Sequence, residues 1–100
     1  MVMIVYISHP YGGLEENKRE IEQIILKLVE TNPQNTYISP VHTFGFLYDA
    51  VPYEEGLEMC LDLLGLCDMA FIFGDYANST GCKAELSHCE MTGKPYVIMN

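Results

Sequence analysis

The last third of the chain constrains the fold more than any other part. Two short apolar runs, residues 69–73 and 96–99, flank a polar stretch of helical length. Such runs are typical of buried strands. Ser79 or Thr80 is the expected N-cap of the intervening helix, and Gly93 is expected to end it. The pattern therefore predicts a strand–helix–strand unit whose two strands are parallel.

Glu85 occupies the second turn of this predicted helix. Helical side chains lean toward the N-terminus of their helix, so its carboxylate is expected at the carboxyl-terminal edge of the sheet. Ligands of open α/β sheets bind at that edge. Gly81 lies four residues earlier on the same helix face and leaves access to the carboxylate. The competing interpretation is an ordinary solvated glutamate, and position alone does not decide between the two.

The remaining segments extend this unit into a complete fold. The patterns predict two further strands and two further helices, at residues 2–7 and 37–39 and at residues 14–30 and 53–66. Their order predicts a single domain over residues 1–100 with a three-layer, Rossmann- or flavodoxin-like α/β fold and a four-stranded parallel sheet. Residues 40–52 are expected to form a long irregular loop, whose aromatic side chains either pack together or cover a planar ligand.

The charge balance excludes several classes of partner. The chain has 14 acidic and 5 basic residues, for a net charge of -9. With no basic patch, it is not expected to bind the phosphate backbone of a nucleic acid or an anionic membrane. It contains no apolar run of membrane-spanning length and no secretion signal, so a cytoplasmic location is expected.

The cysteines and histidines do not predict a metal site. Cys60, Cys67, Cys82 and Cys89 form no CxxC pair, and the three histidines lack the spacing of zinc ligands. We expect reduced, largely buried thiols and no metal or other cofactor.

A glycine pair follows the first predicted strand. Gly12 and Gly13 open the next helix, a place where the backbone can approach an anion or a sugar closely. Glu15 and Glu16 would compete with a phosphate there. A plain turn is the alternative interpretation.

Two motifs resemble those of a known enzyme superfamily. Residues 6–13 with Asn17, and residues 78–85 followed by Gly93-Lys94-Pro95, resemble the nucleoside 2-deoxyribosyltransferase-like superfamily, in particular its small, often phage-encoded members. The resemblance covers nearly the whole chain. In characterised relatives the glutamate of the second motif attacks the anomeric carbon of a nucleoside or nucleotide and releases the base.

The resemblance implies roles for particular residues. Glu85 would be the nucleophile, and Asn17 would brace the loop after the first strand. The substrate site would comprise Tyr6, Gly12, Gly13, Asp68, Ser79 and Gly81. The partner would be a small-molecule nucleoside or nucleotide, and the protein would be a homodimer or a higher homo-oligomer.

One position departs from the superfamily pattern. Relatives usually carry an aspartate, associated with the leaving base, where this chain has Cys60. Three hypotheses therefore stand: an N-glycosidase or deoxyribosyltransferase-like enzyme, a non-catalytic nucleotide- or sugar-binding module, and a small phage-type interaction protein whose acidic face binds another protein.

Overall fold

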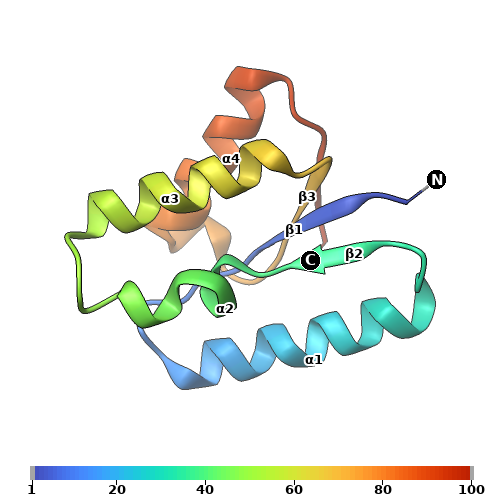
Figure 1. The fold of residues 1–100 in the computed structure, drawn as a ribbon, viewed down its shortest axis with the longest axis horizontal. Helices are drawn as coiled ribbons and strands as arrows, with labels where there is room; N and C mark the ends of the chain where they lie inside the picture. Colours follow the sequence, from blue (N-terminus) through green and yellow to red (C-terminus); the bar gives the residue numbers. More distant parts are fainter. Residues whose placement is uncertain (1, 100) are drawn as a thin grey trace.

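The computed structural model describes residues 2–99, and these form one four-stranded parallel sheet with helices on both faces (Figure 1). The strands are β1 (Ile4–Ser8), β2 (Thr36–Ile38), β3 (Met69–Ile72) and β4 (Tyr96–Ile98), in the spatial order β2-β1-β3-β4. The helices are α1 (Glu15–Thr31), α2 (Pro40–Phe44), α3 (Tyr53–Leu66) and α4 (Thr80–Thr92). The predicted α/β class and parallel sheet are confirmed.

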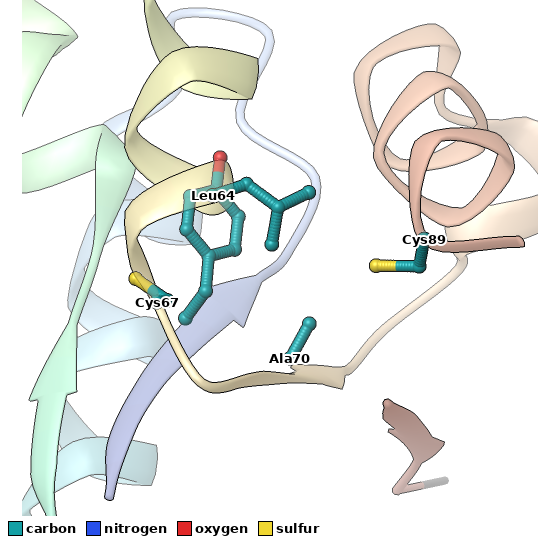
Figure 2. Close-up of a cluster of buried hydrophobic side chains, with 5 residues drawn as sticks. Leu64, Cys67, Ala70 and Cys89 are labelled. Atoms are coloured by element: carbon teal, nitrogen blue, oxygen red, sulfur yellow. The ribbon is translucent and has the colours of Figure 1, made fainter. Parts of the chain in front are cut away.

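Two apolar clusters hold the three layers together. On one face, Val5 and Ile7 of β1 pack with Ile21 of α1 and Val41 of α2. On the other face lie α3 and α4 (Figure 1). Their side chains pack against those of β1 and β3. Figure 2 shows four members of this second cluster, which are Leu64, Cys67, Ala70 and Cys89. The cavity described below lies at the carboxyl-terminal edge of the sheet, where α4 approaches β1.

The strand–helix–strand unit forms as its boundary residues predict. The Ser79 hydroxyl accepts a hydrogen bond from the Cys82 backbone N–H at 3.2 Å, so Ser79 is the N-cap. Gly93 ends the helix with φ at +73°, a left-handed conformation that glycine adopts without steric cost. Ser79 fixes where α4 begins and therefore which turn carries Glu85, and Gly93 fixes where the helix ends.

The prediction of a long irregular loop over residues 40–52 is wrong. Its first part is the helix α2, and a 3-10 turn, η1 (Gly45–Leu47), follows it. Ser39 caps α2 by accepting from the His42 backbone N–H at 3.3 Å, and Pro40 occupies the first helical position, which suits its fixed φ. The aromatic residues of this segment are therefore held by regular structure.

The first strand begins two residues later and ends one residue later than expected. It runs to Ser8, which pairs with Ile72 of β3, whereas the pattern ended it at residue 7. This shift places Ser8 in the sheet rather than in the loop after it. Over residues 2–99, no helix is long and apolar enough to cross a bilayer.

Candidate active site

Glu85 is a buried carboxylate with two hydroxyl partners. It lies on the inner face of α4 and is 6% exposed. The Tyr6 hydroxyl donates a hydrogen bond to one carboxylate oxygen, and the Ser8 hydroxyl donates to the other at 2.7 Å. Both oxygens are thus held in place by groups on the central strand of the sheet.

Strand and helix periodicity together produce this arrangement. Successive side chains of a strand alternate between faces, so Tyr6 and Ser8 point toward α4 while Val5 and Ile7 point toward α1. On α4 the buried residues are Cys82, Glu85 and Cys89, spaced as one helical stripe. The stripe has a carboxylate at its centre, and the two hydroxyls supply the hydrogen bonds that a buried carboxylate requires.

Burial controls the ionisation of Glu85. Loss of hydration raises the pKa of its carboxyl group to about 7, and the hydrogen bonds from Tyr6 and Ser8 oppose part of that rise. Burial, and next the charge of Glu85, raise the pKa of Tyr6 well above its ordinary value. Tyr6 therefore stays a neutral phenol that donates to the carboxylate.

Two thiols flank the carboxylate. Burial raises the pKa of Cys60 to about 11, with a further rise from Glu85 that a hydrogen bond with Tyr6 partly offsets. The pKa of Cys82 is also raised, first by burial. Both thiols are protonated at neutral pH, so among the described residues the floor of the site carries one ionisable carboxylate and no thiolate.

A cavity of about 600 Å³ opens above Glu85. Its walls come from the loop after β1, from the α2–η1 segment, and from the first turns of α3 and α4. No described residue that lines it is a lysine or an arginine. The imidazole of His9 also lines it, with Nε2 3.4 Å from a carboxylate oxygen of Glu20. The cavity has the size of a small organic ligand and holds no fixed cation other than this imidazole when it is protonated.

Three tyrosines form the mouth of the cavity. The ring of Tyr48 makes edge-to-face contacts with Tyr11, at a centroid distance of 5.3 Å, and with Tyr53, at 6.5 Å. Gly13 has φ at +76°, and a Cβ atom there would lie 3.0 Å from the Tyr48 ring. The second glycine of the pair predicted after the first strand thus makes room for an aromatic side chain.

The structure brings most of the predicted site residues together. Gly12, Asn17, Ser79, Gly81 and Glu85 all line the cavity. Asn17 donates from Nδ2 to the Tyr11 carbonyl at 2.9 Å, the bracing contact that was expected.

Tyr6 and Gly13 take part in the site indirectly. Neither belongs to the described cavity wall. Tyr6 is fully buried behind Glu85, which it contacts through its hydroxyl, and Gly13 lies against the ring of Tyr48. Tyr6 was expected to line a sugar site, whereas its place is behind the carboxylate.

The expectation for Asp68 is wrong. Asp68 precedes β3 and therefore lies at the amino-terminal edge of the parallel sheet, opposite the edge that carries the cavity. Its carboxylate accepts a hydrogen bond from the Ile4 backbone N–H at 2.7 Å. Asp68 thus closes the start of β1 and does not contact the cavity.

Two polar residues of the site escaped the sequence patterns. The sequence pattern ends the first strand at residue 7 and therefore leaves Ser8 outside it. Its position two residues after Tyr6 is the signal that both share a strand face. Tyr53 was assigned only as the start of a helix, and nothing in its sequence context indicates that its hydroxyl reaches the first turn of α4. Among residues 2–99, no group of three potential ligands could hold a metal ion.

Comparisons with known proteins identify a family and a structure of similar fold. Residues 3–99 match a family model described as a domain of unknown function, DUF7768. No curated protein matches the sequence. A solved structure described as a 2-deoxyribosyltransferase from the psychrotolerant bacterium Bacillus psychrosaccharolyticus matches with a TM-score of 0.69 and 21% identity, over 97% of this chain and 77% of that chain. At that identity the match shows a shared fold.

Proposed function

We propose that this chain, which belongs to the DUF7768 family of domains of unknown function, cleaves the N-glycosidic bond of a nucleoside with Glu85 as its nucleophile. The observation that carries the proposal is the setting of Glu85: a buried carboxylate, braced through both oxygens, at the floor of a cavity. The shared fold with a structure described as a 2-deoxyribosyltransferase supports the same reaction class.

A braced carboxylate suits attack on an anomeric carbon. One oxygen of Glu85 forms a bond to C1′ while the C1′–N bond breaks, and the electron pair of that bond leaves with the base. The sugar passes through an oxocarbenium-like state that the carboxylate charge stabilises. Water or a second base then attacks C1′ from the face that the first base left. The carboxylate is released, and the two displacements together retain the sugar configuration.

Tyr6 and Ser8 hold the nucleophile in the orientation that attack requires. Because each donates to a different oxygen, the carboxylate cannot rotate without losing a hydrogen bond. Because burial raises its pKa to about 7, Glu85 combines appreciable ionisation at neutral pH with the higher basicity that favours bond formation.

The cavity favours a nucleoside without a 5′-phosphate. Its described lining contains no lysine or arginine to pair with a phosphate dianion, and Glu20 faces its one imidazole. The net charge of -9 further disfavours an anionic substrate. The tyrosines at the mouth supply planar apolar surface for a base.

Base release tests this proposal directly. Purified protein is incubated with 2-deoxyribonucleosides and their 5′-monophosphates, and free base is followed by chromatography. We expect release from nucleosides, a slower rate with monophosphates, and a loss of about 10³-fold or more in Glu85→Gln. Glu90→Gln removes an exposed carboxylate from the same helix and serves as the matched control, with unchanged rates expected.

The covalent step has its own readout. In a nucleoside that carries fluorine at C2′ of the sugar, the fluorine destabilises the oxocarbenium-like state and slows breakdown of a glycosyl-enzyme. Mass spectrometry should then find the sugar attached to a peptide containing Glu85. Undiminished base release by Glu85→Gln would falsify the mechanism. Saturable nucleoside binding with no release from any substrate would instead identify a binding module on this fold.

A further inference from the structure

The hydroxyl of Tyr53 reaches across the cavity from α3 to α4. Tyr53 is the first residue of α3, and its ring is 44% exposed at the cavity mouth. A Cβ atom added to Gly81 would lie 3.1 Å from the Tyr53 hydroxyl oxygen. The phenol therefore extends over the turn of α4 that precedes Glu85, and the missing side chain at Gly81 makes room for it.

This hydroxyl is available to a ligand. Among residues 2–99 it makes no hydrogen bond, whereas the hydroxyls of Tyr6 and Ser8 are both engaged with Glu85. Partial burial raises the pKa of Tyr53, and the neighbouring Tyr48, Glu85, Cys60 and Cys82 raise it further. At neutral pH the cavity wall thus presents a neutral O–H donor that a ligand can engage.

Departure of a nucleobase creates a need for such a donor. When the C1′–N bond breaks, negative charge develops on the ring nitrogens and carbonyl oxygens of the base. The floor thiols stay protonated and are weak donors, and Glu85 is committed to C1′ in the proposed reaction. Attack and departure occur on opposite faces of C1′, so the donor must come from a wall other than the floor.

We propose that Tyr53 is a further catalytic residue, whose hydroxyl donates a hydrogen bond to the departing base. This inference rests on the proposed function. As the C1′–N electron pair moves onto the base, the Tyr53 O–H stabilises the developing negative charge. The phenol keeps its proton, and water supplies the proton that makes the free base neutral. The role is electrostatic stabilisation of the transition state.

The test compares leaving groups that differ in their need for a donor. The 7-methylguanine of 7-methyl-2′-deoxyguanosine is already cationic in the substrate and departs as a neutral molecule. We expect Tyr53→Phe to lower kcat for 2′-deoxyinosine by about 10- to 100-fold and to change kcat for the methylated substrate less than about threefold. Rates are corrected for spontaneous depurination.

Two further variants make the test specific. Gly81→Ala places a methyl group 3.1 Å from the Tyr53 hydroxyl oxygen and shifts it by a few tenths of an ångström, so it should give a smaller loss with the same selectivity while the phenol remains. Tyr37→Phe removes a hydroxyl that donates to the Asn32 carbonyl at 3.0 Å, outside the cavity, and should leave both substrates unaffected. Circular dichroism of each variant checks that the fold persists.

The outcomes separate this inference from the proposed function. Equal losses on both substrates, or no loss on either, would overturn the role of Tyr53 while Glu85-dependent release by the wild type upholds the reaction. If the wild type releases no base from any substrate, the reaction itself fails. Binding of free hypoxanthine, followed by tyrosine fluorescence, then tests the donor alone: we expect an approximately tenfold weaker Kd in Tyr53→Phe, and an unchanged Kd overturns the inference.

Discussion

The floor and the mouth of the cavity are built in opposite ways. The floor is formed by the carboxylate of Glu85, which the hydroxyls of Tyr6 and Ser8 support from behind; all three residues are buried and joined by hydrogen bonds. Two of the three tyrosines at the mouth, Tyr48 and Tyr53, are 39% and 44% exposed and contact each other only at a ring edge. The floor belongs to the central strand and an inner helix face, whereas the mouth belongs to a connecting segment and the first turn of a helix.

This difference assigns different tasks to the two regions. A buried network with both carboxylate oxygens bonded has one arrangement and favours a fixed chemical geometry. Half-exposed rings can adjust to a ligand and contribute mainly to its affinity. Substitutions of the floor carboxylate and its two hydroxyl partners should therefore change kcat and ionisation. Substitutions that remove ring surface at the mouth should change KM, whereas loss of the Tyr53 hydroxyl alone should change kcat.

The largest effect is expected on the stability of the floor itself. A pKa raised from 4.5 in the unfolded chain to about 7 in the fold means that the folded state keeps the Glu85 proton after the unfolded state has lost it. The free energy of unfolding therefore falls as pH rises from 4.5 to 7, by about 3 kcal/mol. Glu85→Gln lacks this titration, so its stability relative to the wild type should increase by that amount between pH 4 and pH 8.

Urea unfolding of both proteins across this pH range measures the effect. Glu90→Gln is the control, because its exposed carboxylate should produce a much smaller difference. A stability difference between Glu85→Gln and the wild type that stays constant with pH would show that the buried floor does not perturb the carboxylate.

The next effect concerns the hydroxyl behind the nucleophile. Tyr6→Phe removes the hydrogen bond that favours the charged form of Glu85, so the pKa of Glu85 should rise further. The proposed nucleophile must be ionised, so the rising limb of the pH–kcat profile should move to higher pH. The limiting kcat should fall by about 10- to 100-fold.

A pH–rate profile of base release checks this prediction. Tyr96→Phe is the matched control, since its ring packs against the same apolar cluster as Tyr6. If Tyr6→Phe lowered the rate equally at all pH values, Tyr6 would have a packing role and the contrast between floor and mouth would weaken.

The smallest effect is expected at the mouth. Tyr48→Ala removes the ring that spans Tyr11 and Tyr53, so KM for a nucleoside should rise about tenfold while kcat changes little. Phe46→Ala is the control, because Phe46 lies in the neighbouring 3-10 turn and is 80% exposed. A loss confined to kcat would contradict the division of tasks between the two regions.

The floor was more predictable from sequence than the mouth. Ser79 and Gly93 mark the ends of α4, and the lean of helical side chains places Glu85 at the ligand edge of the sheet. The bounds of α3, residues 53–66, also emerge from its apolar spacing and preceding proline. These are local properties, which depend on few residues and short distances along the chain.

The features that escaped prediction depend on contacts between distant segments. Ser8 joins β1 because it pairs with Ile72, more than sixty positions away along the chain. Tyr53 belongs to the site because α3 and α4 pack closely enough for its hydroxyl to reach Gly81. For Asp68 the resemblance indicated a site role, but its place before a parallel strand assigns it to the opposite edge. The oligomeric state and the cellular compartment of the protein remain predictions of the sequence.

Because β1 is a central strand, the part of the site that it carries should open only when the whole fold unfolds. β1 is paired on both sides, and its residues from Val5 to Ser8 are fully buried. Strands of this kind open only in global unfolding, and their amides exchange last with solvent. The proposed nucleophile is therefore expected to keep its two hydroxyl partners until the molecule unfolds cooperatively.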